Sequence, residues 1–360
     1  MKKRRPALWL IAAALLLALA ALLLHEPDDS PPRADLKDVQ FPRYMDQEAR
    51  QRVARRRTLS IARADSDAGS DEPKRQFDPL LAALAPEGQA NTAVIIEANA
   101  LVNSSIGQAL LDCVSDSGGS TLKEIKDTLG VDLLTDVDRV AVNDGVTFLS
   151  GNFSGLTVEK LQGLPMANQE KYGEHGSIWT NEDGDVMGRW KDELVLLGRD
   201  RKSVEASIDR LEAGGAGDPP IGEQETYGEI YGAIQAASFA EVLPPEIAEQ
   251  LMAVTQRVKI HVDADDDVGI VADIDGDDMQ KITDLARSVG GALALGRMDA
   301  VRSDRKDMAE LLDYAKVTTR EGGFRLELAL PRQWLEDNVL SRCRAEAQAA
   351  GAGTDGGTAP

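Results

Sequence analysis

The pattern of hydrophobic and polar positions divides the chain into an apolar N-terminal run, a polar connecting region and a long body of short alternating segments. Residues 7–24 form an uninterrupted apolar run. As a helix this run would measure about 27 Å, close to the ~30 Å hydrocarbon thickness of a bilayer. Basic residues at positions 2–5 precede the run, and acidic residues follow it. The pattern predicts a single-pass inner-membrane protein whose N-terminus is cytoplasmic and whose body is periplasmic or otherwise extracytoplasmic.

A cleaved signal peptide is the alternative interpretation of the same run. Ala18-Leu19-Ala20 has the small-x-small form of a cleavage site. The apolar run continues to Leu24, however, and mature proteins seldom begin with such a stretch. This favours an uncleaved anchor over residues 1–24, and under both interpretations the body is exported.

The region between the apolar run and the body, residues 25–90, is expected to be a linker with a basic juxtamembrane stretch. Within it, residues 44–63 have a helical pattern with a thin apolar face. This stretch would either contact anionic lipid headgroups or form a solvated stalk. The arginines that would make the lipid contact are Arg50, Arg52, Arg55, Arg56 and Arg57. At the other end of the chain, residues 344–360 are rich in Gly and are expected to be a disordered tail.

Alternating apolar residues in the body predict hairpins, each followed by a helix. RVAVNDGVTFL, from Arg139, places two strands around an Asp-Gly turn, and RVKIHVDADDDVGIVADI, from Arg257, does the same around an acidic turn. The helices MQKITDLARSV and RKSVEASIDRLEAG follow two of the hairpins. We therefore predict an α+β fold with two similar units, residues 91–214 and 226–343. Each unit is expected to be β-α-ββ-α-ββ-α, with antiparallel hairpins and helices packed on one face.

An apolar N-terminal segment ahead of a duplicated α+β body resembles uncharacterised membrane-anchored or secreted proteins of Gram-negative bacteria. The segment most similar to them is GVDLLTDVDRVAV, which precedes the first predicted hairpin. The resemblance implies no established activity, so it supplies no site residues.

Charge and composition narrow the range of functions. The formal net charge of the chain is −21, but residues 1–63 carry +6 and the remainder −27. A body this acidic repels phosphate backbones, so we predict no nucleic-acid partner. Aromatic residues make up 4% of the chain, which disfavours an aromatic-lined pocket, and we predict no cofactor.

One segment resembles a catalytic motif. Cys113-Val-Ser-Asp-Ser-Gly-Gly is similar to the nucleophile segment of trypsin-like proteases. That family also needs a His and an Asp upstream of the nucleophile, and the upstream histidine here is His25, beside the apolar run. We interpret the segment as the end of a helix followed by a loop, and we predict no catalytic residue.

The weak metal candidate is the acidic turn Asp263, Asp265 and Asp267, which has the spacing that opens an EF-hand loop. The loop's Gly position is Val268, and its bidentate Glu position is Ile274. A solvated turn is the more ordinary interpretation, so calcium binding remains a secondary hypothesis.

The histidines and cysteines do not identify a functional site. His25, His175 and His261 are not at metal-ligand spacing, so we predict no zinc site, and His261 is expected to face solvent. Cys113 and Cys343 are the only cysteines, and in an oxidising compartment they would either form a disulfide or remain as thiols.

These observations favour a membrane-anchored, periplasm-facing envelope protein that acts as a non-enzymatic binding or scaffolding module for a partner still unknown. Two alternatives remain. The first is an exported hydrolase with a site between the two units, which a cluster of buried polar residues at their junction would favour. The second is a domain that responds to divalent cations through the turn at residues 263–267.

Overall fold

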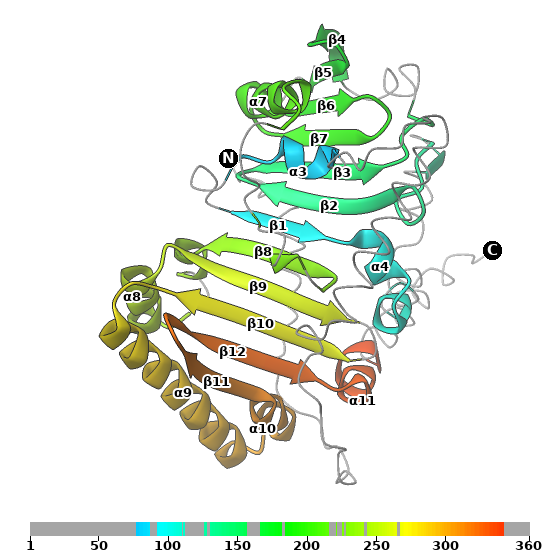
Figure 1. Cartoon of the computed structure of the whole chain (residues 1–360). Helices are drawn as coiled ribbons and strands as arrows, with labels where there is room; N and C mark the ends of the chain where they lie inside the picture. The colour runs from blue at the N-terminus through cyan, green and yellow to red at the C-terminus, as the bar shows by residue number, and fades with distance from the viewer. Residues whose placement is uncertain are drawn as a thin grey trace, which may run out of the picture.

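One antiparallel β-sheet of 12 strands runs through the whole of the computed structural model (Figure 1). The strand pairs on which this order rests are all antiparallel. The structure describes residues 77–86, 92–109, 111, 126–127, 130–156, 166–181, 184–215, 221, 225–226, 228–240, 243–264 and 267–341.

The strand order places the first strand in sequence at the middle of the sheet. From one edge to the other the strands are β11 (Ala315–Arg320), β12 (Gly323–Leu330), β10 (Val268–Asp275), β9 (Arg257–Ala264), β8 (Ile230–Gln235), β1 (Ala93–Ile96), β2 (Val137–Asn143), β3 (Val146–Gly151), β7 (Leu194–Gly198), β6 (Val186–Trp190), β5 (Gly176–Asn181) and β4 (Met166–Tyr172).

The predicted fold class, a transmembrane helix followed by two units with helices on one face, is wrong. The strands form one continuous sheet, because β1 pairs with β8 across the boundary between the two expected units. No helix in the described ranges is both long and apolar enough to span a bilayer, which contradicts the predicted transmembrane helix and signal anchor. Residues 7–24 and 50–57, on which the anchor and the lipid contact were predicted, lie outside those ranges.

The strand order is the same on the two sides of the central β1–β8 pair. Outward from β1 it runs β2, β3, β7, β6, and outward from β8 it runs β9, β10, β12, β11. The hairpin β4–β5 extends the sheet beyond β6, and among the described residues no strand lies beyond β11. This hairpin was not predicted from the sequence, since its first strand is rich in polar residues.

Hairpin turns form where Gly and Asp were expected to allow them. Asp144 (φ 44°) and Gly145 (φ 90°) both adopt the left-handed conformation that a two-residue turn requires between β2 and β3. Between β9 and β10, Ala264 pairs with Val268. These two hairpins confirm the alternating pattern from which they were predicted.

In the first half of the sheet, α3 (Pro79–Ala83) and α7 (Arg201–Glu212) cover one face, and the short helix α4 (Ala98–Val102) follows β1. Asp200 caps α7 by accepting a hydrogen bond from the Ser203 N–H at 2.9 Å. The core under these helices contains Leu80, Ala83, Ile95, Phe148, Ile178, Leu194, Leu196, Val204, Ile208, Leu211 and Tyr231. A smaller apolar cluster on the opposite face contains Val131, Phe153, Trp179, Met187 and Val195.

In the second half, α8 (Pro245–Val254) and the long helix α9 (Met279–Arg302) pack on the sheet, as the lower part of Figure 1 shows. Asp278 caps α9 by accepting from the N–H groups of Gln280 and Lys281. The core there includes Leu251, Val258, Ile274, Ile282, Leu285 and Phe324. The remaining elements are η3 (Ala236–Phe239), α10 (Lys306–Asp313), α11 (Arg332–Leu335) and the π-helical turn η4 (Glu336–Leu340).

The two halves bury their main cores on opposite faces of the sheet. Register places Ala93, Ala233 and Lys259 on one face, because each is the cross-strand partner of the next. Ala93 belongs to the core under α3 and α7, whereas the core under α9 contains Val258, the neighbour of Lys259 on the other face. Helices therefore cover both faces, because the apolar positions change side at the centre of the sheet.

We predict that the central strand pair tolerates only glycine at position 232. Gly232 has φ 149°, and a Cβ there would lie 2.7 Å from the Val94 Cα and still closer to the Ala93 carbonyl oxygen. Gly232→Ala should lower the free energy of unfolding by about 2–4 kcal/mol, because both the strain and the backbone clash persist in the folded state. Urea unfolding followed by circular dichroism measures the change.

Gly290→Ala is the matched control for this substitution. A Cβ at Gly290, in the interior of α9, meets nothing within 4 Å. This substitution should raise the free energy of unfolding by about 0.5–1 kcal/mol through helix propensity. If the two substitutions changed the free energy of unfolding equally, a specific steric requirement for glycine at position 232 would be contradicted.

Candidate functional site

A cluster of buried polar side chains lies at the β1–β8 junction, on the face that carries α3. The Tyr231 hydroxyl donates a hydrogen bond to Glu97 Oε1 at 2.7 Å, which links β8 to the end of β1. The Glu97 N–H donates to the Glu229 carbonyl oxygen at 2.7 Å. Glu97, Glu229 and Tyr231 are all buried.

Arg139 and Asp78 form a two-pronged ion pair beside this cluster. Arg139 Nη1 lies 2.7 Å from Asp78 Oδ2, and Nη2 lies 2.8 Å from Oδ1. Burial lowers the pKa of Arg139, but the nearby Asp78 carboxylate outweighs it and raises that pKa above its ordinary value. Asp78 also accepts hydrogen bonds from the N–H groups of Leu80 and Leu81, so one carboxylate caps α3 and fixes it to β2.

His261 and Glu229 extend the cluster into the second half. His261 is the cross-strand partner of Tyr231, and only 3% of it is exposed. The expectation that His261 faces solvent is therefore wrong. Glu229 Oε2 accepts a hydrogen bond from the Ala264 N–H at 2.8 Å.

This cluster occupies the position at which the hydrolase hypothesis expected its site. The hydrogen bonds of Glu97 and Glu229 given above go to a neighbouring strand, so these carboxylates join strands. The described hydrogen bonds at the junction hold neighbouring strands together. They therefore do not favour the hypothesis of a hydrolase over that of a binding module.

A row of ion pairs continues along the same face of β9, β10, β12 and β11. Lys259 contacts Glu225 and, at 3.6 Å, Asp275. Burial lowers the pKa of Lys259. Its hydrogen bond with Glu225 and the charge of that carboxylate raise the pKa by more, so it lies above its ordinary value. The row contains three acids and three bases, so their formal charges cancel. The remaining pairs are Arg320 with Asp275, Arg320 with Asp273 at 3.4 Å, and Arg325 with Asp273 at 2.8 Å.

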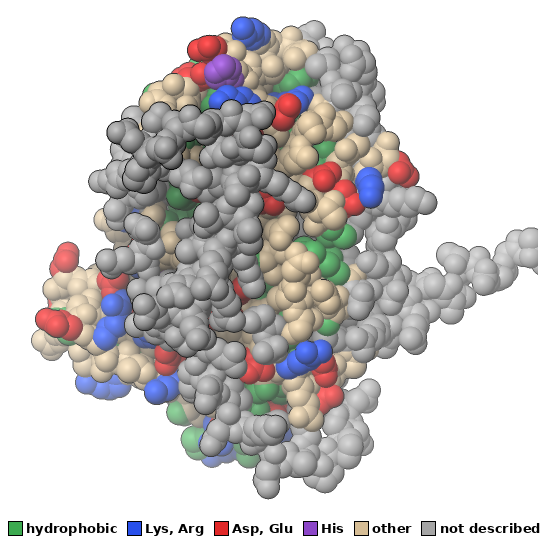
Figure 2. Space-filling model, turned by 45° about the vertical axis from the view of Figure 1, so that its right-hand side comes forward, with side chains coloured by type: hydrophobic (Ala, Val, Ile, Leu, Met, Phe, Trp, Pro, Cys, Tyr) green, Lys and Arg blue, Asp and Glu red, His purple; other side chains and the backbone are tan. Residues whose placement is uncertain are grey.

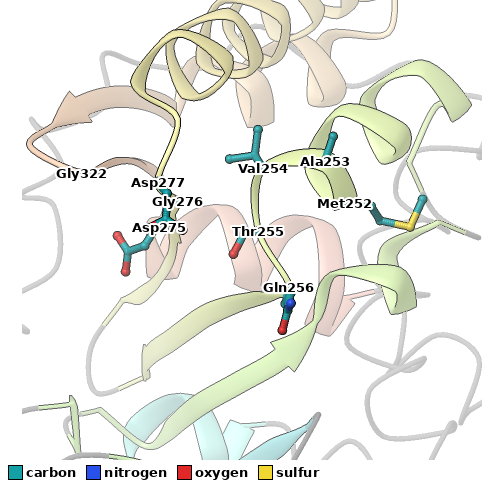
Figure 3. A pocket seen from close by; sticks show the side chains of 9 residues that line it. All are labelled: Met252, Ala253, Val254, Thr255, Gln256, Asp275, Gly276, Asp277 and Gly322. Carbon is teal, nitrogen blue, oxygen red and sulfur yellow. The ribbon is translucent and has the colours of Figure 1, made fainter. Parts of the chain in front are cut away.

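An open pocket of about 500 Å³ lies at one end of the second half, where α8 leads into β9 (Figure 3). Figure 3 shows its side chains spread around the opening. The Asp275 carboxylate in its wall is already held by Arg320 and Lys259, and the Thr255 hydroxyl donates to the Arg257 carbonyl oxygen at 2.7 Å. The surface of the lining is largely polar, and the described contacts of its residues do not place a nucleophile beside a base. The lining consists of Met252, Ala253, Val254, Thr255, Gln256, Asp275, Gly276, Asp277 and Gly322.

Helix α9 exposes large apolar side chains on its outer side. Leu295 is 67% exposed, Met298 52% and Val301 63%. These positions are spaced three residues apart, so they lie along one side of the helix, together with exposed Gly291 and Ala294. We call these five residues the α9 surface. On the side of the molecule that Figure 2 shows, acidic and basic side chains are interspersed, so charge does not single out a binding surface there.

The residues of the predicted calcium turn are only partly described. Asp263 is half-buried on β9, and Asp267 accepts a hydrogen bond from the Arg332 N–H at 2.9 Å. Asp265 lies outside the described residues, so calcium binding at this turn stays a prediction. Cys113 and Cys343 also lie outside them, so the disulfide stays a prediction as well.

The α9 surface was missed at the sequence level because the helix was expected to end near Val289, ahead of Gly290-Gly291. The helix continues through both glycines to Arg302. The periodic apolar residues after Gly291 (LALGRMDAV) were the signal that could have revealed it.

Comparison with known proteins gives no assignment. No family model matches the chain, and no curated protein matches it. Among solved structures, crystal form III of TP0453 is similar with a TM-score of 0.42 and 13% identity, over 74% of this chain and 100% of that one. Crystal form IV of TP0453 gives 0.44 and 11%, over 74% and 97%. At these values the likeness supports no statement about function.

We predict that breaking the Arg139–Asp78 pair strongly destabilises the fold. Asp78→Asn keeps a side chain that can cap α3 but leaves the buried Arg139 charge without its anionic partner. The free energy of unfolding should fall by about 3 kcal/mol, within the range for breaking a buried ion pair. Chemical denaturation at pH 7 measures the change.

Asp200→Asn serves as the control because Asp200 is an exposed cap of α7. It should cost about 1 kcal/mol or less. If both variants lose the same stability, the buried pair has no role beyond capping.

Proposed function

We propose that the chain is a non-enzymatic binding module, working outside the cytoplasm, that holds a protein partner on the α9 surface. The observation that carries the proposal is the exposure of Leu295, Met298 and Val301 on one side of α9. Contiguous exposed apolar side chains on a folded protein mark sites of interaction.

The geometry of the α9 surface favours an amphipathic helix as the bound element. Side chains three and four residues apart form ridges that pack into the grooves of a second helix. Gly291 and Ala294 lie beside these ridges and carry little or no side chain, so a second helix can approach closely. The partner should therefore present an apolar helical face to α9.

The exposed edges of the sheet are less suited to binding another chain. Strand β11 lies at one edge, and its exposed residues include Lys316, Thr318 and Arg320. Strand β4 lies at the other edge, and its exposed residues include Glu170 and Lys171. Charged residues on an edge strand discourage the addition of a further strand. This supports the helix as the binding element.

Export is supported by the N-terminal sequence, in which basic residues 2–5 precede the apolar run at 7–24. The acidic body is consistent with a partner other than nucleic acid.

Site-specific photo-crosslinking tests the binding surface. A photoreactive amino acid at Ala294, within the α9 surface, should give a crosslinked protein in cells, and one at Thr318 on β11 should not. Adding Leu295→Asp and Met298→Asp should reduce the Ala294 crosslink at least tenfold, since two charges would have to be buried against the partner. Because both side chains are exposed, the free energy of unfolding should fall by no more than about 1.5 kcal/mol, mainly through the lower helix propensity of Asp.

The outcome of the crosslinking is decisive in either direction. A crosslink that survives both Asp substitutions, or equal crosslinking from Thr318, would overturn the proposal. A crosslinked product made of two copies of this chain would overturn the proposal of a different protein as partner and would show that the α9 surface forms a homodimer.

A protease-protection experiment tests export separately. A C-terminally tagged full-length chain should lose its tag when protease is added to spheroplasts, while a cytoplasmic control protein remains intact. Protection of the tag until the spheroplasts are lysed would contradict an extracytoplasmic body.

A further inference from the structure

Three side chains that can bind a metal meet where the β4–β5 turn packs against the end of α7. Glu174 and His175 belong to the turn, and Glu212 is the last residue of α7. One potential donor atom from each of the three lies within 4.8 Å of the other two. The group combines an imidazole with two carboxylates, and zinc and related ions accept both kinds of donor.

Glu212 is held in place before any ion binds. Its Oε1 accepts a hydrogen bond from the His175 N–H at 2.9 Å and another from Trp190 Nε1 at 3.2 Å. Both of these bonds go to Oε1, so Oε2 is the oxygen available to a ligand. The indole and the turn backbone act as the outer partners that orient a metal-binding carboxylate.

The turn is attached to α7 by a second contact one helical turn earlier. The Tyr172 hydroxyl lies 3.1 Å from Asp209 Oδ1 and 3.2 Å from Oδ2. Burial and the hydrogen bond to Asp209 both raise the pKa of Tyr172. The turn therefore presents His175 to α7 in a defined register, rather than as part of an unattached loop.

The local charge favours a cation. The carboxylates of Glu174, Glu212 and Asp209 lie at the C-terminal end of α7, where the helix dipole contributes further negative charge. Lys191 is the basic residue beside the group, and its Nζ lies 4.2 Å from the centre of the Trp190 ring.

We propose that Glu174, His175 and Glu212 bind one divalent transition-metal ion, of which Zn²⁺ is the expected physiological example. Bond lengths near 2.0 Å in a tetrahedral site require donor atoms about 3.3 Å apart, so the donors must approach one another. The His175 side chain is 43% exposed and that of Glu174 79%, so both can rotate toward Glu212. Water completes the coordination, and the ion joins the β4–β5 hairpin to α7. This site is independent of the α9 surface.

Metal titration of the full-length, tag-free protein after chelator dialysis tests this site. Zn²⁺ should bind with a stoichiometry of one and raise the melting temperature, because it binds the folded state only. Co²⁺ should produce the visible absorption of a low-symmetry site, whereas Ca²⁺ should not compete with Zn²⁺ for this site, since it prefers oxygen ligands.

Variants identify the ligands. His175→Ala and Glu212→Gln should each weaken Zn²⁺ binding at least tenfold, and Glu246→Gln, at an exposed position of α8, should leave it unchanged. If Glu212→Gln unfolds the protein, His175→Ala alone decides, because the turn side chain is exposed. A Zn²⁺ affinity that is unchanged in His175→Ala, or the absence of any Co²⁺ absorption in the wild-type protein, would overturn the site.

Discussion

The close antiparallel contact between β1 and β8 is the constraint on which the rest of the structure depends. This pair is short, since only four residues of β1 take part, yet it joins the strands of the first half to those of the second. The pair is possible because residue 232 is glycine, whose missing Cβ lets the β1 backbone approach. Without that contact each half would present an open edge strand, which tends to pair with other chains.

The same contact determines where polar groups are buried. The apolar positions change face at the centre of the sheet, so the face under α3 becomes polar as it passes from β8 to β9. Buried charges at such a boundary need partners, because an unpaired charge in a low-dielectric interior is very costly. Arg139 and Asp78 pair with each other, Glu97 bonds to Tyr231, and the ion row begins at Lys259. A cluster of buried acids and a histidine therefore arises from the architecture itself.

Local features of the sequence were predictable where one residue determines the backbone. The Asp144-Gly145 turn followed from the backbone conformations that Asp and Gly allow at those positions. Long-range features were not predictable in this way. Whether β1 pairs with β8 depends on two segments more than a hundred residues apart, and Glu212 meets His175 only because α7 packs along the β4–β5 turn. Periodicity shows which residues of a strand share a face, but not which face an element far along the chain will cover.

Helix α9 shows how a local cost can indicate an external contact. Glycine in a helix interior costs roughly 0.5–1 kcal/mol relative to alanine, and α9 contains Gly290, Gly291 and Gly296. Gly296 lies beside Leu312, where a Cβ would be 3.4 Å from a methyl group, an ordinary contact distance. At Gly290 and Gly291 a Cβ would meet nothing within 4 Å, so no contact in the described part of the chain requires a glycine there. Gly291 belongs to the α9 surface, beside Leu295 and Met298, where the missing side chain leaves room for a second helix. In the described residues, a conformational cost without an internal benefit and an apolar surface without an internal partner thus occur on the same turns of one helix. The proposed packing against a partner helix would account for both.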